Sequence, residues 1–466
     1  IIMLEFTPIT YKNAARVRAC YRHCDYRVSD YSVGMKLMWK SYFRPEIAFA
    51  CGCLIVKDTF GGKVRFDYPV PETEDADIDG ALDEIEKYCM DKYIPLVFYA
   101  VPQEKLGALI ARYRYCRTES TPVLDEYIYR ADDMMSFSGK HYSGQRNHIN
   151  KFYKLYSNAK FPTLEASDKP KLEKFFGKFT YSSQKNGRGA DVELKRSRET
   201  LLRDISWGCA GCMELDGEII ALSLGEICGD TMIIHIEKAL HEYEGVYPAT
   251  VSAFAERFCG GVKYINREED TGDPGLRRSK TQYRPKFMQR KYDVYVETEL
   301  RAWDKIPTLK TERLTLAPLT DSEAKDYFKL CTDDERNKYW GYDYREDCEN
   351  PEEDYFINVA RDDFESKTAA NFAIKYGRKF IGEVILYDFD YHGGAQIGVR
   401  ISSGCDGRGF GKEAISAVMD AALYDLELSV VYAKCYLENV KSQRMLSACM
   451  QKTGEDAEFR YFERRI

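Results

Sequence analysis

Metal-binding and membrane-spanning patterns are both missing from this sequence. Its 466 residues include only six histidines, and these are scattered without the spacing of a metal site. No apolar run is long enough to cross a bilayer, and no basic segment followed by an apolar one forms a leader. We therefore expect a cytoplasmic protein that binds no metal and is not inserted into a membrane.

A strong excess of one charge is also absent. The formal net charge is −7 at pH 7, which argues against general binding to nucleic acids or anionic membranes. Cysteine, by contrast, is plentiful at 15 residues. Cys209 and Cys212 have the spacing of a zinc or redox pair, but no second pair accompanies them. We interpret the cysteines as reduced thiols.

Two common nucleotide-binding motifs are missing as well. A P-loop requires Gly-Lys followed by Ser or Thr, and no hydroxyl residue follows Lys412. A dinucleotide-binding fold requires wider glycine spacing and an acidic residue at the end of the next strand. Residues 406–414 do form a glycine-rich loop, Asp-Gly-Arg-Gly-Phe-Gly-Lys-Glu-Ala. The two missing motifs exclude a P-loop and a dinucleotide-binding fold as explanations of this loop.

This glycine-rich loop lies between a predicted strand and a predicted helix. An apolar run at 397–401 precedes it, and apolar residues at helical spacing follow it from Ala414 to Leu426. Glycines let a bound group approach the backbone, and the N–H groups at a helix N-terminus attract anions. The pattern predicts a phosphate-binding loop.

The loop and two further segments resemble the GCN5-related N-acetyltransferases (GNAT). The loop pattern of that family, Gln/Arg-x-x-Gly-x-Gly/Ala, corresponds to Asp406-x-x-Gly409-x-Gly411. The strand and Asn-x-x-Ser that follow in the family correspond to residues 430–442, and residues 311–319 are similar to the first strand of its ribosomal-protein acetyltransferase branch. The resemblance covers residues 306–466 and implies that acetyl-CoA is the co-substrate.

The resemblance also implies roles for individual residues. The pyrophosphate of acetyl-CoA is expected at the loop, on Gly407, Arg408, Gly409, Phe410, Gly411 and Lys412. The pantetheine arm is expected along Val399, Arg400 and Ile401, with Asn439 and Ser442 beside it. Asn439 could instead cap a helix. Trp340 and Tyr342 are expected to shape the amine pocket.

The base that deprotonates the amine is less narrowly defined. Candidates near the expected thioester are Glu383, Asp388, Asp390 and His392, and we predict Glu383 or Asp390. The alternative for Glu383 is an outward-facing polar residue of a strand.

The sequence departs from the family pattern at three places. The first loop position is Asp406 instead of Gln or Arg, and an acid there is unfavourable beside a pyrophosphate unless it faces away. Leu446 stands where the family often has a tyrosine acid, and Met450-Gln451 replaces the usual Gly-Phe. We therefore expect the thiolate to leave directly or to take its proton from water.

The N-terminal segments resemble a different group of proteins. Residues 125–152, 236–247, 266–272 and 275–285 are similar to an uncharacterised bacterial family grouped with the C-terminal domain of phosphatidylglycerol lysyltransferases. The resemblance covers about residues 3–297. It implies a pair of acetyltransferase-like folds and a possible donor carried on tRNA. A lipid acceptor is less expected, because the membrane helices of those enzymes have no counterpart here.

Basic residues of this region are the candidates for substrate binding. Arg146 lies in the basic run 140–154, which is either a cradle for phosphate or RNA or a solvated helix face. Arg277 and Lys280 either bind substrate or pair with acids at 266–270. The loop 237–247 has one glycine and three glutamates, so we predict that this region does not bind CoA.

The sequence as a whole predicts an α/β protein of three acetyltransferase-like units with mixed sheets flanked by helices. Two units, about 3–155 and 156–297, would form an N-terminal domain. A linker at 298–309 would lead to the third unit at 310–466. We expect an N-acetyltransferase acting on a primary amine of a small molecule or a protein N-terminus. The alternatives are an N-terminal aminoacyl-tRNA-dependent transferase or an N-terminal substrate-binding module, and the oligomeric state stays open.

Overall fold

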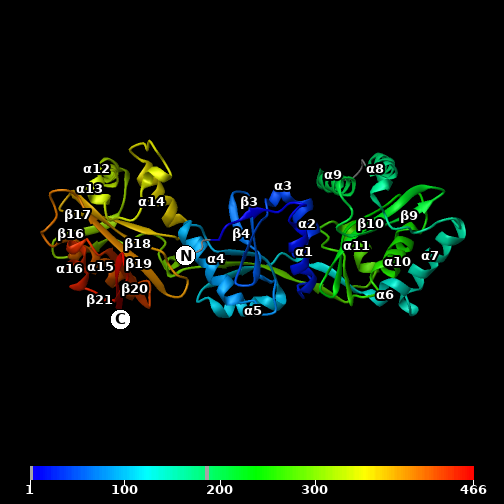
Figure 1. Ribbon diagram of the computed structural model, residues 1–466, viewed down its shortest axis with the longest axis horizontal. Coiled ribbons are helices and arrows are strands. Elements are labelled where there is room, and N and C mark those ends of the chain that lie inside the picture. Colours follow the sequence, from blue (N-terminus) through cyan, green and yellow to red (C-terminus); the bar gives the residue numbers. More distant parts are fainter. Residues whose placement is uncertain (1–3, 184–187) are drawn as a thin grey trace. The chain divides into compact units, whose positions relative to one another are not determined.

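The computed structural model describes residues 4–183 and 188–466, which form three mixed β-sheets flanked by helices (Figure 1). Residue 3, with which the predicted N-terminal domain begins, lies outside the described residues. Within these two ranges, no helix combines the length and apolar character needed to cross a membrane.

The chain divides into two compact units. The first contains residues up to Leu82, Val97–Gly107 and Thr118–Val294, and the second contains Asp83–Leu96, Ala108–Arg117 and Tyr295–Ile466. The sequence patterns did not indicate that two short segments before residue 118 belong with the C-terminal unit. Leu300 and Trp303 of the predicted linker are buried in the core of the third sheet.

The first sheet has eight strands. Along its main path the order is β1 (Thr7–Pro8), β2 (Glu46–Ala50), β3 (Cys53–Phe60), β4 (Lys63–Phe66), β6 (Val97–Pro102), β14 (Lys291–Val296) and β7 (Cys116–Glu119), and β5 (Val70–Pro71) pairs with β3. Its helices are α1 (Ala14–His23), α2 (Val33–Met38), α3 (Lys40–Phe43), α4 (Ile78–Asp91) and α5 (Gln103–Arg112). Strands β2, β3 and β4 are antiparallel, whereas β4 and β6 are parallel and pair at Phe66 and Phe98.

The second sheet has six strands in the order β13 (Phe287–Gln289), β8 (Glu126–Arg130), β12 (Tyr264–Asn266), β11 (Thr231–Ala239), β10 (Glu218–Cys228) and β9 (Cys209–Leu215). Its helices are α6 (Ala131–Ser136), α7 (Ser143–Leu155), α8 (Lys169–Ser183), α9 (Arg188–Arg203), α10 (Val246–Phe258) and α11 (Pro274–Gln282). Asp216 and Gly217 form the hairpin turn that joins β9 to β10, with φ of 50° and 84°.

The third sheet has eight strands in the order β15 (Leu309–Lys310), β16 (Leu314–Pro318), β17 (Ala370–Tyr376), β18 (Lys379–Tyr387), β19 (Gly394–Ile401), β20 (Val430–Tyr436), β22 (Phe459–Arg465) and β21 (Gln451–Glu455). Its helices are α12 (Ala324–Cys331), α13 (Asp334–Asn337), α14 (Tyr355–Glu365), α15 (Phe410–Tyr424) and α16 (Val440–Ser447). Strands β17, β18 and β19 form an antiparallel meander.

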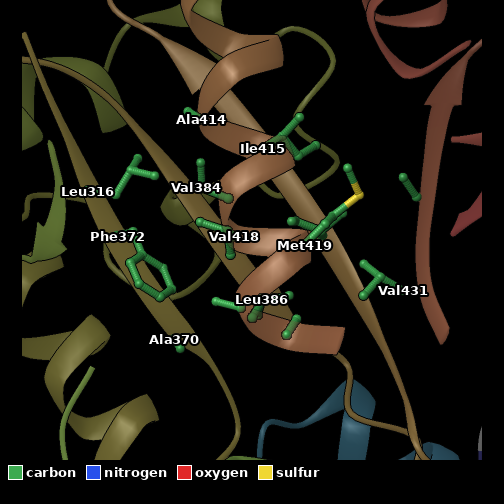
Figure 2. Packing of buried hydrophobic residues seen from close by; sticks show 14 of the residues in the cluster. Leu316, Ala370, Phe372, Val384, Leu386, Ala414, Ile415, Val418, Met419 and Val431 are labelled. Atoms are coloured by element: carbon green, nitrogen blue, oxygen red, sulfur yellow. The ribbon is translucent and has the colours of Figure 1, made fainter. Parts of the chain in front are cut away.

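Helix α15 packs its apolar stripe on the third sheet, as the sequence predicted. Ala414, Ile415, Val418 and Met419 are fully or almost fully buried. They meet side chains of the strands, among them Leu316, Phe372, Val384, Leu386 and Val431 (Figure 2). Burial of a large apolar side chain contributes about 1.5–3 kcal/mol. This core therefore fixes the start of α15, and with it the glycine-rich loop, at one end of β19.

Candidate functional site

Two neighbouring parallel strands of the third sheet separate after three residue pairs. β19 and β20 pair from Gly394 with Val430 to Gln396 with Tyr432. Beyond that point β19 stays paired with β18, and β20 stays paired with β22. The facing edges, 397–401 and 433–436, are not joined by any strand pairing in the described part of the chain. We call this opening the β19–β20 wedge.

The predicted pantetheine residues lie on one edge of the wedge. The side chains of Val399 and Ile401 pack against the core beneath α15, so the apolar face of their strand is covered by the protein's own core. Arg400 points to the other face of the sheet, where its guanidinium contacts Glu383. The side chains of these residues are thus engaged within the protein, and their main chain is what faces the wedge.

The predicted phosphate loop has the backbone of an anion site. Gly404, Gly407 and Gly409 have φ of 77°, 77° and 81°, the left-handed region that favours glycine. Gly409 is the N-cap of α15 and supplies no capping side chain, so the first turn of the helix offers its N–H groups outward. Arg408 and Lys412 are exposed beside it. Phe410 is buried in the core and stacks near Tyr376 at 5.1 Å between ring centroids.

A hydrogen-bond network that the sequence did not reveal connects this loop to the turn before β16. Glu413 in the first turn of α15 accepts hydrogen bonds from the Thr311 hydroxyl at 2.5 Å and from Arg313 Nε at 2.7 Å. Arg313 Nη1 in turn donates to the carbonyl oxygen of Arg408 at 3.0 Å. The turn between β15 and β16 is therefore tied to the glycine-rich loop.

The unusual acid of the loop, Asp406, has two cationic partners. Its carboxylate lies 3.7 Å from Arg336 Nη2 and 3.6 Å from Lys441 Nζ. A backbone hydrogen bond and then the charge of Arg336 lower the pKa of Asp406, so it is ionised. Its charge is compensated, and Arg336 and Lys441 are gathered beside the loop. Their positions were not foreseen because they come from other elements.

Asn439 adopts the alternative role considered above. Its side-chain oxygen accepts a hydrogen bond from the backbone N–H of Ser442 at 3.1 Å and caps α16. The hydroxyl of Ser442 lies near the Cys435 thiol on β20 and acts to lower its pKa, although burial raises that pKa overall. Both residues therefore have structural contacts at the β20 side of the wedge, and their contact with a pantetheine arm stays a prediction.

The segment after α13 contacts both strands of the wedge. A Cβ atom on Gly398 would lie 3.2 Å from the ring of Trp340, so this ring rests directly on β19. The Tyr339 and Tyr436 rings lie 5.7 Å apart, which brings the same segment to the end of β20. Tyr342 is 47% exposed and donates to Asp347. Of the two residues predicted to shape an amine pocket, Trp340 is the one at the wedge.

The contacts of Glu383 do not fit the predicted base, nor the outward-facing alternative. Its side chain is fully buried and bonded to Arg400. The Tyr327 hydroxyl and the Asn371 amide also donate to it, at 2.8 and 3.3 Å. A carboxylate with all these donors is held as an ion-pair partner, and removing its charge would leave Arg400 buried without compensation.

The other two carboxylates lie in the loop between β18 and β19. Asp390 accepts from the backbone N–H groups of His392 and Gly394, at 2.9 and 2.7 Å, and thereby clamps this loop. Asp388 accepts from the Gln396 amide at 3.0 Å, and Gln396 is the last paired residue before the wedge opens. Burial raises the pKa of Asp388 to about 6, while Lys434 on β20 acts to lower it. Of the acids considered, Asp388 best fits a base at the apex of the wedge.

The second sheet contains a similar separation, but side chains fill it. β11 and β12 pair in parallel only from Thr231 to Ile233 of β11. Beyond that point Glu237 pairs with Arg267 at 2.6 Å, and His235 bonds to Glu268 at 2.9 Å. Gly245 begins α10 with φ of 82°, yet a Cβ there would lie 2.4 Å from a carbonyl oxygen of α7. This helix start is covered.

Comparison with known proteins assigns the region that contains the filled β11–β12 separation and the region that contains the β19–β20 wedge to two different families. Residues 21–295, more than half of the sequence, match the family described as phosphatidylglycerol lysyltransferase, C-terminal. The chain belongs to this family. Residues 313–449 match the acetyltransferase (GNAT) domain, so the third sheet and its helices form a domain of an acyltransferase type.

Individual relatives are distant. An uncharacterised protein of Mycoplasmoides gallisepticum, MYCGA3080, is 27% identical over 36% of this chain, and the match spans 56% of that relative's length. An uncharacterised N-acetyltransferase of Bacillus subtilis, YoaA, is 28% identical over 33% of this chain and 89% of its own length. A conserved protein of unknown function from Bacteroides thetaiotaomicron has a solved structure with a TM-score of 0.59 and 24% identity. It covers 63% of this chain and 99% of its own, and it supports the fold alone.

The basic residues predicted to bind substrate in the lysyltransferase-like domain all have internal partners. Arg146 donates to the carbonyl oxygens of Phe137 and Gly139. Arg277 forms a two-bonded ion pair with Asp270, at 2.9 and 3.0 Å. Lys280 donates to three backbone carbonyl oxygens after β12, and burial lowers its pKa. These contacts agree with the alternative that Arg277 pairs with an acid at 266–270. The side chains of Arg146 and Lys280 stabilise the fold by hydrogen bonds to backbone carbonyl oxygens.

A buried polar cluster of the same domain was missed in the sequence. His235 lies between Glu226 and Glu268, at 3.5 and 2.9 Å. Burial acts to lower its pKa, but the two carboxylates outweigh burial and raise the pKa to about 9. Around it, buried polar atoms lack a hydrogen bond, namely Arg18 Nε, Trp207 Nε1, Glu226 Oε2 and His235 Nε2. The members come from α1, β10, β11 and the segment before β9, so no local motif could reveal them. Within the described ranges, no group of three His, Cys, Asp or Glu residues could hold a metal ion.

Proposed function

We propose that the second unit is an acetyl-CoA-dependent N-acetyltransferase that acts on a primary amine of a small molecule or a protein N-terminus. The observation that carries this proposal is the β19–β20 wedge next to an uncapped helix start. The main-chain N–H and C=O groups on the facing edges of β19 and β20 need hydrogen-bond partners. The extended pantetheine arm that carries the thioester can provide these partners in the way that an added short strand would. The GNAT match and the similarity to YoaA support the same chemistry.

The loop residues would hold the pyrophosphate in this proposal. The N–H groups from Gly409 to Lys412 and the helix dipole attract the anion, and Arg408 and Lys412 add positive charge from exposed positions. Arg336 and Lys441 compensate Asp406 and keep the local field favourable to phosphate. Val399–Ile401 and Asn439 would flank the pantetheine arm.

The transfer step would occur at the apex of the wedge. The amine nitrogen attacks the thioester carbonyl carbon, and a main-chain N–H of the β19 edge stabilises the developing oxyanion. Asp388 takes the proton from the nitrogen as the C–N bond forms, because that nitrogen then becomes acidic. The C–S bond breaks, and the thiolate takes its proton from water, since Leu446 offers none. The Trp340 ring, which rests on Gly398, would form one wall of the pocket for the amine.

Replacement of Gly409 by glutamate is expected to weaken acetyl-CoA binding at least tenfold, which is about 1.4 kcal/mol. The substitution places a side chain and a negative charge at the anion site. Gly217→Glu is a matched control, because Gly217 also has a positive φ, of 84°, and has open space around it in a hairpin of the first unit. Calorimetry measures both affinities. Equal affinity in folded Gly409→Glu and Gly217→Glu proteins would refute the cofactor site.

A pH–rate profile tests Asp388 as the base. A base acts only when deprotonated, so activity should be present above pH 6 and decline as pH falls through about 6, where Asp388 titrates. Asp388→Asn should lower the rate by roughly 100-fold near pH 7 and recover partly at high pH, where hydroxide can take the proton from the attacking nitrogen. Asp390→Asn is the comparison, since its carboxylate clamps the loop. An unchanged profile in Asp388→Asn would exclude this role.

We further propose that the family domain consists of two acetyltransferase-like units, about 3–155 and 156–297, before a linker at 298–309 and the GNAT unit at 310–466. The same order of elements in each sheet supports the number of units, although β8 lies in the second sheet and β14 in the first, so the exact bounds rest on the sequence patterns. An antiparallel meander leads to a helix and then to a strand parallel to the last of the meander, as in β2–β3–β4 with β6, β9–β10–β11 with β12, and β17–β18–β19 with β20.

For the lysyltransferase-like domain we propose aminoacyl transfer from tRNA as the second function, with a substrate-binding module as its alternative. The family match carries this proposal. The filled β11–β12 separation argues against CoA there. Trp207 Nε1 is buried beside the His235 ring without a hydrogen bond, and a buried polar group left so costs roughly 1–3 kcal/mol, which favours a site for polar groups. Arg18 and His235 are ion-paired with Glu226, at 4.0 and 3.5 Å.

Salt-dependent binding of aminoacyl-tRNA to the full chain tests this second function. Contacts with about three phosphates would weaken binding roughly 40-fold between 50 and 200 mM salt, since the slope is near −0.9 per phosphate. Arg278 is exposed beside Arg277 and serves as the site of a charge-reversal variant, Arg278→Glu, which should weaken binding further. No binding at 50 mM salt would remove the transferase proposal and leave the binding module.

A further inference from the structure

The loop from Asp388 to Gly394 has a backbone that requires support from its surroundings. Asp388 and Tyr391 have φ of 47° and 59°, which side-chain-bearing residues adopt at a cost of about 1 kcal/mol or more each. Asp390 clamps the loop from within. Because Asp388 sits at the first strained position, the geometry of this proposed base depends on what holds the loop.

The outer support comes from two segments that precede residue 118 and belong to the second unit. His392 Nε2 lies 3.0 Å from Glu86 Oε2, and the His392 ring stacks on Tyr113 at 6.0 Å with 21° between the planes. The ring of buried Tyr391 meets the same Tyr113 edge-on at 6.4 Å. Consecutive loop residues thus rest on one tyrosine and one carboxylate.

This support is itself fixed. The side chain of Glu86 is 6% exposed, and its other oxygen accepts from Arg112 Nε at 2.9 Å. Arg114 Nη1 donates to the carbonyl oxygen of Glu427 at 3.0 Å and would lie 3.6 Å from a Cβ on Gly393. We call Glu86, Arg112 and Tyr113 the Glu86 anchor.

We propose that Glu86 and Tyr113 are positioning residues of the acetyl-transfer site, so that segments 83–96 and 108–117 complete a site whose other residues come from the C-terminal domain. The inference rests on the proposed function and deepens it. The anchor holds His392 and Tyr391, these hold the strained loop, and the loop holds Asp388 against Gln396 at the wedge. Without the anchor, the loop is free to relax to an unstrained backbone.

The anchor also controls the surroundings of Asp388. The charged or titratable groups that face it are Lys434 of β20, Asp91 at the end of α4, and Tyr93 and Tyr387. Burial is the largest cause of its raised pKa. A relaxed loop would expose Asp388 to water, and its pKa would fall towards the ordinary value of an aspartate. The base would then be weaker and less well placed.

Variants of the full chain test the anchor by two independent measurements. Hydrogen–deuterium exchange reports the backbone of residues 388–396 without any reaction. Turnover of acetyl-CoA with 2-phenylethylamine or a heptapeptide with a free N-terminus, measured from pH 5 to 9, reports the base. In Glu86→Ala and Tyr113→Ala we expect at least tenfold faster exchange, about tenfold lower kcat, and an acidic midpoint moved below that of the unaltered chain. Acetyl-CoA affinity should stay within twofold.

Three further variants keep the test decisive. Tyr113→Phe keeps the stacked ring but removes the hydroxyl that interacts with Glu86 and Arg112, so its exchange and kcat should lie between those of the unaltered chain and Tyr113→Ala. Asp83→Ala removes an exposed partner of Arg112 and should leave kcat and exchange unchanged. His392→Ala removes the loop side of the contact at a side chain that is 43% exposed, so it tests the same link if Glu86→Ala does not fold.

The outcomes separate the two proposals. Unchanged exchange, or faster exchange with an unchanged pH profile, in folded Glu86→Ala or His392→Ala proteins would overturn the positioning role alone. Absence of acetyl transfer by the unaltered chain, with both acceptors, would overturn the proposed function and this inference with it.

Discussion

The requirement that main-chain hydrogen-bonding groups find partners governs this protein. When two parallel strands diverge, each loses the neighbour that satisfied its N–H and C=O groups. β19 and β20 diverge after Gln396 and Tyr432, and no other strand enters between them in the described residues. The site follows from this divergence, because an extended ligand arm can occupy the place of the absent strand while the start of α15 receives its charged end.

The second sheet shows how the same divergence can lead elsewhere. There Arg267 with Glu237 and His235 with Glu268 connect the two separating segments, and α7 lies over the helix start at Gly245. In the third sheet the corresponding charges turn away from the opening, because Arg400 is bonded to buried Glu383 and stacks 4.3 Å from the Trp340 ring centroid. Side chains, more than strand order, decide whether such a separation accepts a ligand.

Local patterns in the sequence predicted the elements around the site well. The apolar stripe from Ala414 placed α15, and the glycines placed the turn before it, because both signals come from neighbouring residues. The roles of single acids were harder to predict. Glu383 looked like an exposed or catalytic acid, but its partners Arg400, Tyr327 and Asn371 are supplied by three other elements. Asp388 was among the candidates without being selected, since burial, which raises its pKa, depends on tertiary packing. The three-unit architecture and its boundaries stay a prediction supported by the repeated element order.

The number of acetyl-CoA molecules bound by one chain tests the central claim most directly. Calorimetric titration of the full chain gives this stoichiometry without any knowledge of the amine. If an open strand separation with an uncovered helix start is what binds the co-substrate, the chain should bind one acetyl-CoA at the β19–β20 wedge. The separation of β11 and β12 is bridged by Arg267 and Glu237, and Asp77 caps the start of the helix between β4 and β6. Binding of two or more molecules, or of none, would contradict the account.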